Sequence, residues 1–215
     1  MKRTNNDTKK NTKELILLTA LRLFAKNGYE AVSVSIIASE LGMVKSALYK
    51  HYKSKRDIFD SIVKRMSEMD YEKAAASQMP EGTYEEMPEA YEKAQFKDIK
   101  SFMEEMFIHW TTEEFSTLFR KMLTVEQYRN EEMSKLYEQY LSSAPLSYME
   151  DLLTEITGDK KNARLLALRF YAPMYMLYSL YDTAADKDAA RDVGKMLEKH
   201  IDTFIAEVKA AYGLE

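Results

Sequence analysis

The 215-residue sequence contains no cysteine, which excludes disulfide bonds, thiolate zinc sites and cysteine nucleophiles. Its longest stretch without a charged residue, Phe170 to Tyr181, is too short to span a bilayer, which takes about 20 residues. The first 14 residues are polar and lack the apolar segment of a signal peptide. We therefore expect a cytoplasmic protein that has no membrane partner.

Glycine and proline are also scarce, with 6 and 4 residues, so few positions force a helix to end. Strand-like alternation is rare, and apolar residues recur at helical spacing nearly throughout the chain. These features predict an all-α fold of about nine helices, at residues 11–27, 33–41, 45–52, 55–77, 98–111, 113–126, 131–156, 161–183 and 186–212. Residues 78–97, which hold two prolines and Gly82, are expected to form a long loop, and the 131–156 helix is expected to bend between Ser142 and Pro145.

The two signs of charge are unevenly distributed. Residues 1–66 carry 14 Lys and Arg against 6 Asp and Glu, a balance of +8, whereas the rest of the chain carries 17 against 29, a balance of −12. A basic end on an acidic body indicates a polyanion partner for the basic end. A solvated basic tail that binds nothing gives the same balance, so charge alone leaves both interpretations open.

Residues 33–52 have the pattern of a helix-turn-helix, two short helices joined by a tight turn that contains glycine. Ser33 is a good N-cap for the first helix, and Gly42 permits the positive φ that the turn requires. Ala38 is small at the position where the two helices would cross closely. A helical corner that binds no DNA has the same geometry. The two interpretations can therefore be separated only by the side chains that the second helix carries.

The second short helix carries donors suited to DNA. Lys45, Ser46 and Ala47 occupy its N-terminal end, where a recognition helix meets base edges. One turn later come Tyr49, Lys50 and His51, whose side chains can donate to phosphates, and Lys55 begins the next helix. We predict ten DNA-contacting residues: Ser33, Ser35, Val44, Lys45, Ser46, Ala47, Tyr49, Lys50, His51 and Lys55.

The segment from Ser33 to Lys55 resembles the TetR family of transcriptional regulators. It reads SVSIIASELGMVKSALYKHYKSK, which is similar to the family pattern T-V-x-x-I-A-x-x-x-G-V-S-x-x-x-L-Y-x-H-F-x-s-K. The Leu23-Phe24 and Gly28-Tyr29 pairs match the end of the family's first helix. Val44 departs from the pattern, because the family usually has a Ser or Thr there that caps the recognition helix. That helix is therefore expected to start differently or to fray.

The resemblance implies a homodimeric regulator, most often a repressor, that a small molecule releases from DNA. We accordingly expect a helix-turn-helix head at residues 1–53, a long fourth helix at about 55–77, and a ligand-sensing and dimerisation domain within 54–215. The expected partners are palindromic double-stranded operator DNA, a second copy of the chain, and an apolar or aromatic effector. No cofactor is expected.

Seven large residues in the C-terminal part are predicted to line the effector pocket: Met103, Phe107, Trp110, Met122, Tyr128, Tyr171 and Tyr175. They are apolar or amphipathic and lie on helices that the resemblance places around the pocket. Because none of them is Arg or Lys, a neutral or weakly cationic effector is favoured over an anion. Core packing and a dimer seam are the simpler explanation of the tyrosine-rich 161–183 helix, although the two roles can occupy different faces of it.

An enzyme is the competing class of protein. Glu104, Glu105, Glu113 and Glu114 offer carboxylate pairs, but a solvated helix face explains them more simply. The sequence has no Gly-rich phosphate loop, Ser-His-Asp order or metal-binding motif, and His109 stands without a second ligand at suitable spacing. A helical adaptor would explain the acidic body but not the donors at 45–55. We therefore predict that the protein is not an enzyme and has no metal site.

Overall fold

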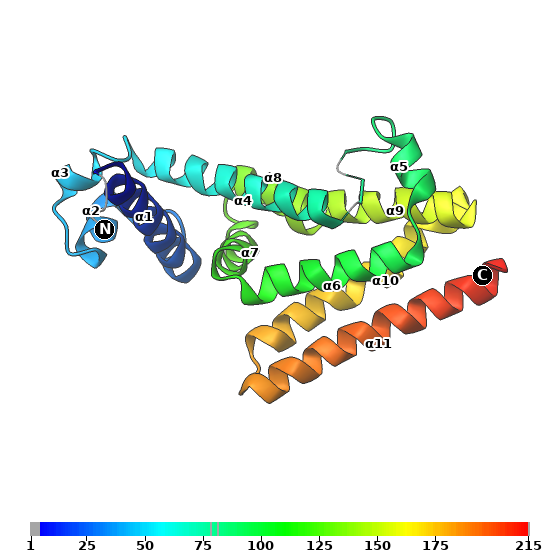
Figure 1. Cartoon of the computed structure of the whole chain (residues 1–215). Coiled ribbons are helices and arrows are strands. Elements are labelled where there is room, and N and C mark those ends of the chain that lie inside the picture. Colours follow the sequence, from blue (N-terminus) through cyan, green and yellow to red (C-terminus); the bar gives the residue numbers. More distant parts are fainter. Residues whose placement is uncertain (1–4, 78, 81, 215) are drawn as a thin grey trace. The chain divides into compact units, whose positions relative to one another are not determined.

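The computed structural model describes residues 5–77, 79–80 and 82–214, and within these residues every regular element is a helix (Figure 1). The predicted all-α fold is thus confirmed. None of the helices in this part of the chain is long and apolar enough to cross a membrane. The chain divides into two packing units, each with its own core.

Unit 1 comprises Met1–Asp70 and Glu114–Tyr137. Its helices are α1 (Asn5–Asn27), α2 (Val34–Glu40), α3 (Lys45–Leu48), most of α4 (Lys55–Ser77), α7 (Glu114–Glu126) and the beginning of α8 (Glu131–Leu141). The helix α1 packs against both α2 and α7. Large apolar side chains from α1 to α4 are fully buried, among them Phe24, Ile37, Leu48 and Phe59. This core holds the short helices, which are too short to be stable alone.

Unit 2 comprises Tyr71–Glu113 and Glu138–Glu215. It contains α5 (Pro88–Lys93), α6 (Phe96–Thr112), α9 (Ser143–Thr157), α10 (Lys160–Asp182) and α11 (Lys187–Tyr212). The helix α10 packs against α6, α9 and α11, so its Phe170 and Met174 lie in the centre of the core. The side chains of Asp159 and Asp186 accept backbone N–H groups and so cap the starts of α10 and α11.

The helix boundaries differ from the prediction at four places. The helix α1 begins at Asn5 rather than at Asn11, and α3 ends at Leu48 rather than at residue 52. The predicted 78–97 loop contains α5, because Pro88 occupies the first turn, where a missing N–H costs nothing. The expected bend in 131–156 is a break between α8 and α9 at Ser142, whose φ of −137° and ψ of −102° are not helical.

The predicted boundary at residue 53 separates a DNA-binding head from a ligand-sensing and dimerisation domain. This division by function stays a prediction. By packing, α7 and the first part of α8 belong with the N-terminal helices in unit 1. The sequence did not indicate this, because α7 follows α6 after a single residue and its apolar residues have the same helical spacing as those of unit 2.

Candidate nucleic-acid interface

The helix-turn-helix is built by local hydrogen bonds. The Ser33 Oγ accepts the Ile36 N–H at 3.3 Å and caps α2. The chain then turns at Gly42, whose φ is +62°, and the Met43 N–H donates to the Ala38 carbonyl at 2.9 Å. A Cβ at Gly42 would meet no atom within 4 Å. Glycine is therefore required there by the backbone angle rather than by space.

The recognition segment, residues 44–51, is anchored by one buried side chain, and most of its other residues are exposed. Leu48 is fully buried, whereas Val44 is 69% exposed at the N-cap of α3 and makes no side-chain capping bond. The chain continues beyond Leu48 in turns that bring the Lys50 N–H to the Ala47 carbonyl at 3.2 Å and the His51 N–H to the Leu48 carbonyl at 2.9 Å. The first N–H groups of α3 therefore have no side-chain acceptor at the N-cap, and only four residues are α-helical.

The ten predicted DNA contacts all lie in this region, and none of them is buried. Three are half-buried: Ala47, His51 and Lys55. The other seven are exposed: Ser33, Ser35, Val44, Lys45, Ser46, Tyr49 and Lys50. The Lys45 Nζ lies 5.7 Å from the centre of the Tyr49 ring, which brings a cation and a hydroxyl together on one exposed surface. Contact with bases or phosphates stays a prediction for all ten residues.

Lys55 is already bound within the protein. Its Nζ donates to the Tyr29 carbonyl at 2.9 Å, lies 4.1 Å from the centre of the Tyr29 ring, and is 3.7 Å from the Glu30 Oε2. The start of α4 is thereby tied to the corner between α1 and α2. A phosphate would have to share this ammonium group with those three partners.

A buried carboxylate from α7 supports the same corner. Glu126 is almost completely buried, and its Oε1 accepts the Tyr29 N–H at 3.3 Å and an Arg129 Nη1 at 3.3 Å. Gly28 has a φ of +84°, and a Cβ on it would lie 2.7 Å from this Oε1. The Tyr29 ring packs edge-on against Phe24 and Phe59, at centroid distances of 5.1 and 5.2 Å. The corner thus depends on α7 as well as on α1.

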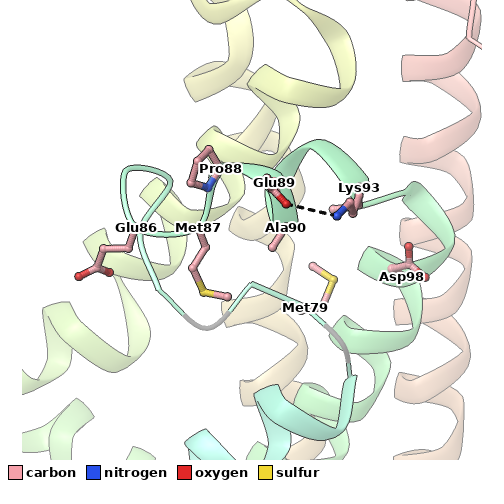
Figure 2. Close-up of a pocket in the computed structure, with 9 residues that line it drawn as sticks. Met79, Glu86, Met87, Pro88, Glu89, Ala90, Lys93 and Asp98 are labelled. Atoms are coloured by element: carbon pink, nitrogen blue, oxygen red, sulfur yellow. Dashed lines mark ion pairs between the residues drawn. The ribbon is translucent and has the colours of Figure 1, made fainter.

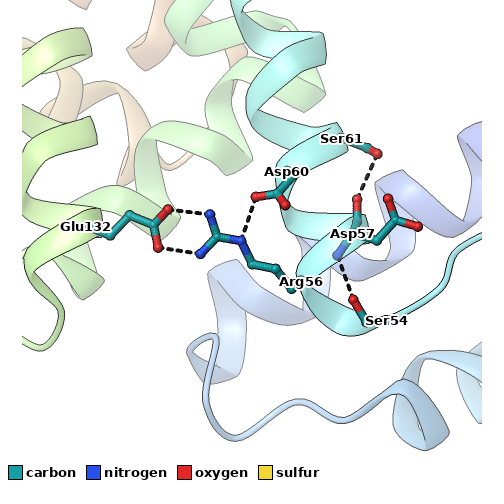
Figure 3. A network of polar contacts seen from close by, with 6 residues as sticks. All are labelled: Ser54, Arg56, Asp57, Asp60, Ser61 and Glu132. Atoms are coloured by element: carbon teal, nitrogen blue, oxygen red, sulfur yellow. Dashed lines mark hydrogen bonds and ion pairs between the residues drawn. The ribbon is translucent and has the colours of Figure 1, made fainter.

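Ion pairs join α1 and α4 to the second segment of unit 1. Figure 3 shows Arg56, whose Nη1 and Nη2 donate to both carboxylate oxygens of Glu132 at 2.7 and 2.6 Å, while its Nε donates to Asp60 at 2.7 Å. The hydrogen bond to Glu132 is the main cause that raises the Arg56 pKa. The Arg22 Nε and Nη2 both lie 2.6 Å from one carboxylate oxygen of Glu114, Oε1. Sequence patterns missed these pairs because the partners lie 76 and 92 residues apart.

The buried Tyr52 links the chain that follows α3 to α1. Its hydroxyl donates to the Lys13 carbonyl at 3.3 Å, and the Lys13 Nζ lies 5.3 Å from the centre of its ring. Burial, with smaller effects from Glu14 and Asp57, raises the pKa of Tyr52 to about 12. The phenol therefore stays protonated and can donate this bond at neutral pH.

Three of the seven predicted effector-binding residues come together in unit 2, where α6 packs on α10. The Tyr171 hydroxyl donates to the Met103 sulfur at 3.6 Å, and the neighbouring Phe107 ring stacks on Tyr178 with a centroid distance of 5.4 Å. Trp110, on the same helix as Phe107, has its ring centre 6.4 Å from that of Tyr140. Desolvation by burial raises the pKa of Tyr171 far above its ordinary value.

The remaining predicted effector-binding residues lie elsewhere. Tyr175 is partly exposed on α10. Met122 and Tyr128 belong to unit 1, where Met122 is fully buried and Tyr128 is 88% exposed. The structure therefore supports a single cluster around Met103, Phe107 and Tyr171, and the binding roles of all seven stay predictions.

A hollow of about 640 Å³ opens beside α5, on the loop that precedes α6 (Figure 2). Its wall mixes two methionines and small apolar residues with charged ones: Met79, Glu86, Met87, Pro88, Glu89, Ala90, Lys93, Ala94 and Asp98. The Glu86 carboxylate accepts the Thr83 N–H at 3.0 Å, and Glu89 pairs with Lys93 at 3.6 Å. None of the seven predicted effector-binding residues lines this hollow.

Three of the four glutamates considered as catalytic pairs, Glu104, Glu113 and Glu114, are held in ion pairs, and Glu105 is exposed. Glu113 binds the Lys73 ammonium at 2.7 Å and lies 3.0 Å from the Nδ1 of the fully buried His109. Burial raises the Glu113 pKa, but Lys73 and His109 outweigh it, so the net shift is downward. Glu114 binds Arg22 instead. Within the part of the chain that the structure describes, no group of three His, Asp or Glu side chains could hold a metal ion.

Known sequences resemble this chain over its N-terminal segment. The sequence model of a family described as bacterial regulatory proteins, tetR family, matches residues 16–62. The uncharacterized HTH-type transcriptional regulator YerO of Bacillus subtilis (strain 168) is 54% identical over 43 residues, which are 20% of this chain and 15% of YerO. The HTH-type transcriptional repressor BepR of Brucella suis biovar 1 (strain 1330) is 37% identical over 65 residues, which are 30% of this chain and 31% of BepR.

The likeness to solved structures extends over nearly the whole chain. In its complex with triclosan, SmeT, the repressor of the Stenotrophomonas maltophilia multidrug efflux pump SmeDEF, aligns with a TM-score of 0.58. The alignment covers 92% of this chain and 91% of that one, at 19% identity. The structural match therefore shows a shared fold, whereas the sequence matches span less than a third of the curated relatives.

Proposed function

Because its N-terminal domain and its fold are those of the TetR family of bacterial regulatory proteins, we propose that this chain is a ligand-responsive transcriptional repressor. It binds palindromic operator DNA as a homodimer and is released by a small effector. Such regulators are DNA-binding proteins rather than enzymes, and the ion pairs of Glu113 and Glu114 agree with that assignment.

The observation that carries the proposal is the exposed recognition segment. Lys45 and Ser46 are exposed on a short helix that the buried Leu48 anchors, and Lys50 is exposed on the turn that follows it. A rigidly held helix with an exposed basic and hydroxyl surface suits the major groove and its phosphates. The glycine turn, the Ser33 cap and the Glu126 contact fix the position of this helix in unit 1.

The surface of α10 supports the homodimer. Leu165, Leu168, Met176 and Leu180 recur along one side of this helix and are each at least 41% exposed. A contiguous apolar stripe on the surface of a subunit indicates an interface. The helices α10 and α11 of one subunit can form a four-helix bundle with the same two helices of a second subunit. Two joined subunits would present their recognition helices to two successive major grooves.

The cluster of Met103, Phe107 and Tyr171 supports an apolar or aromatic effector. These side chains supply rings, a thioether and one hydroxyl, with no cation among them to neutralise an anion. The triclosan complex of SmeT concerns a ligand of this chemical kind in a protein of the same fold. An effector that binds one arrangement of α4 better than another would shift the heads out of the operator spacing.

The proposal is tested by an electrophoretic mobility shift with fragments of the source genome. We expect the wild-type protein to retard a small subset of fragments, and Lys45→Glu/Lys50→Glu to retard none. The matched control is Lys160→Glu/Lys161→Glu, which makes the same charge change in the exposed first turn of α10. Equal loss of binding in both variants, or no retardation by the wild type, would refute the proposal.

The effector assignment has its own test. Hydrophobic cations, flavonoids and acyl compounds are screened for quenching of Trp110, the only tryptophan, while release from DNA is followed. We expect active compounds to be neutral or cationic, and release to be lost in Trp110→Ala/Tyr171→Ala/Tyr175→Ala. If release persists in this variant as a folded dimer, or only strong anions act, the assigned pocket is wrong.

A further inference from the structure

The hollow beside α5 is a second place in unit 2 with the size of a ligand site. Its volume of about 640 Å³ lies within the range of about 300–1,000 Å³ that small-molecule sites occupy. Among the residues that the structure describes, it shares no lining residue with the cluster of Met103, Phe107 and Tyr171. The chemistry of a ligand in the hollow therefore follows from a different set of side chains.

Two hydrogen bonds fix one wall of the hollow, the loop between α4 and α5. The Tyr148 hydroxyl of α9 donates to the Pro80 carbonyl at 3.0 Å, and the Tyr91 hydroxyl of α5 donates to the Gly82 carbonyl at 3.0 Å. The two tyrosine rings also pack edge-on against each other, with a centroid distance of 5.8 Å. Because α5 packs on α9, this wall is in place before any ligand arrives.

Apolar side chains line the hollow from the loop and from α5. Met79, which is 4% exposed, and Met87, which is 36% exposed, point into the space between the loop and Ala90 of α5 (Figure 2). Pro88 and Ala94 complete the apolar part of the lining. Thioether side chains are flexible and polarizable, so they adapt to apolar groups of irregular shape. This part of the hollow suits an alkyl or aromatic group.

Carboxylates outnumber ammonium groups on the same lining. Glu86, Glu89 and Asp98 stand against a single lysine, Lys93, which gives a balance of −2. Lys93 is paired with Glu89 at 3.6 Å, whereas Glu86 and Asp98 accept backbone N–H groups at 3.0 and 3.1 Å. A neutral N–H donor does not cancel a negative charge. A cation in the hollow is therefore attracted by both of these carboxylates.

We propose that this hollow binds an amphipathic cation, an alkyl- or arylammonium compound. Its apolar group lies against Met79 and Met87, and its positive charge lies near Glu86 and Asp98. The inference goes beyond the proposed function, because it gives unit 2 a second ligand site that selects for positive charge. The proposed effector cluster carries no carboxylate and makes no such selection. Binding at the hollow does not depend on operator DNA.

Isothermal titration calorimetry of the full chain with octyltrimethylammonium tests the proposal. The comparison ligands are octanesulfonate, which has the same alkyl chain and the opposite charge, and tetramethylammonium, which has the charge without the chain. We expect octyltrimethylammonium to bind with a dissociation constant on the order of 1 mM, a value typical of so small a ligand. Both comparison ligands should bind at least about tenfold more weakly, and added salt should weaken the binding of the cation.

Two variants separate the hollow from other sites on the protein. Glu86→Gln/Asp98→Asn keeps both hydrogen-bond acceptors but removes two charges, so octyltrimethylammonium should bind about 2- to 30-fold more weakly. The matched control, Glu105→Gln/Glu198→Gln, removes two exposed carboxylates of unit 2 outside the hollow and should bind as the wild type does. Ala90→Trp fills the hollow with a ring and should abolish measurable binding.

Methionine methyl NMR locates the bound ligand directly. In protein labelled at the methionine methyl carbons, Met79→Leu, Met87→Leu and Met103→Leu each identify one signal by its disappearance. We expect octyltrimethylammonium to shift the Met79 and Met87 signals and to leave the Met103 signal unchanged. In Ala90→Trp, titration should shift none of the three. Circular dichroism should show the wild-type helix content in every variant that is titrated.

The inference is overturned if the wild type does not bind octyltrimethylammonium, or binds either comparison ligand equally well. Equal affinities of the charge variant and its control would also overturn it. A shift of the Met103 signal without shifts of Met79 and Met87 would place the ligand in the proposed effector cluster, so that only this inference fails. Loss of the proposed function has a separate sign, since a protein that retards no DNA but shows the expected titration would refute that function alone.

Discussion

At the scale of single residues, Gly28 and Gly42 serve the fold for different reasons. Both have a positive φ, but a Cβ would collide with Glu126 only at Gly28. The sequence marks both as glycine turns, and it correctly predicts the Ser33 cap. It cannot reveal that Glu126 lies over Gly28, because that contact joins residues far apart in the chain and no local pattern encodes it.

Replacement of the two glycines by alanine should therefore have unequal effects. We expect Gly42→Ala to cost about 1–2 kcal/mol, the strain of a left-handed backbone alone. Gly28→Ala should cost about 1–3 kcal/mol more, because the buried carboxylate must also move and leave its donors. Urea denaturation, followed by circular dichroism, measures both losses. Equal losses for the two variants would show that the Glu126 contact contributes nothing.

Lys45 and Lys50 should differ in what they recognise. Lys45 lies at the N-terminal end of α3, so Lys45→Ala should change the preferred base at one operator position. Lys50 lies in the turn beyond, so Lys50→Ala should weaken binding to all sequences and make the salt slope shallower by about one. Selection from a random duplex pool and salt titration give the two results. An unchanged base preference for Lys45→Ala would remove Lys45 from the base-reading residues.

At the scale of elements, the junction between α6 and α7 carries two consecutive glutamates with different partners. Glu113 binds Lys73 of α4 and His109 of α6, whereas Glu114 binds Arg22 of α1. Sequence periodicity located both helices to within a residue or two, since each has a strong apolar face. It missed α5, which a proline in the first turn starts, and it placed the end of α3 at residue 52 rather than at Leu48.

The Glu113 ion pairs predict a pH dependence of stability. The folded pKa of Glu113 lies below its ordinary value, so its contribution is present above about pH 4.5, the ordinary glutamate range, and is lost as pH falls through the folded pKa. Glu113→Gln should therefore be less stable than the wild type at pH 7 and approach it at acid pH. The exposed Glu105→Gln on the same helix is the control. A stability difference that stays constant with pH would contradict the assigned ion pairs.

At the scale of the whole molecule, the apolar stripe on α10 should hold two subunits together. Leu168 and Met176 are 50% and 64% exposed, so an aspartate at either should disturb the interface and leave the subunit core intact. Leu168→Asp/Met176→Asp is expected to give folded monomers in light scattering. Ile108→Asp, at a residue that is 55% exposed on α6, is the matched control and should remain dimeric. A wild-type mass of 25.0 kDa at micromolar concentration would contradict the homodimer.

The central claim is that two copies of this chain read two half-sites of one operator. Selection of bound duplexes from a random-sequence pool, followed by sequencing, tests it most directly. We predict an enriched palindrome whose half-sites are about 10 base pairs apart centre to centre, the spacing of successive major grooves. Enrichment of a single unrepeated half-site, or of no sequence above the starting pool, would contradict the account.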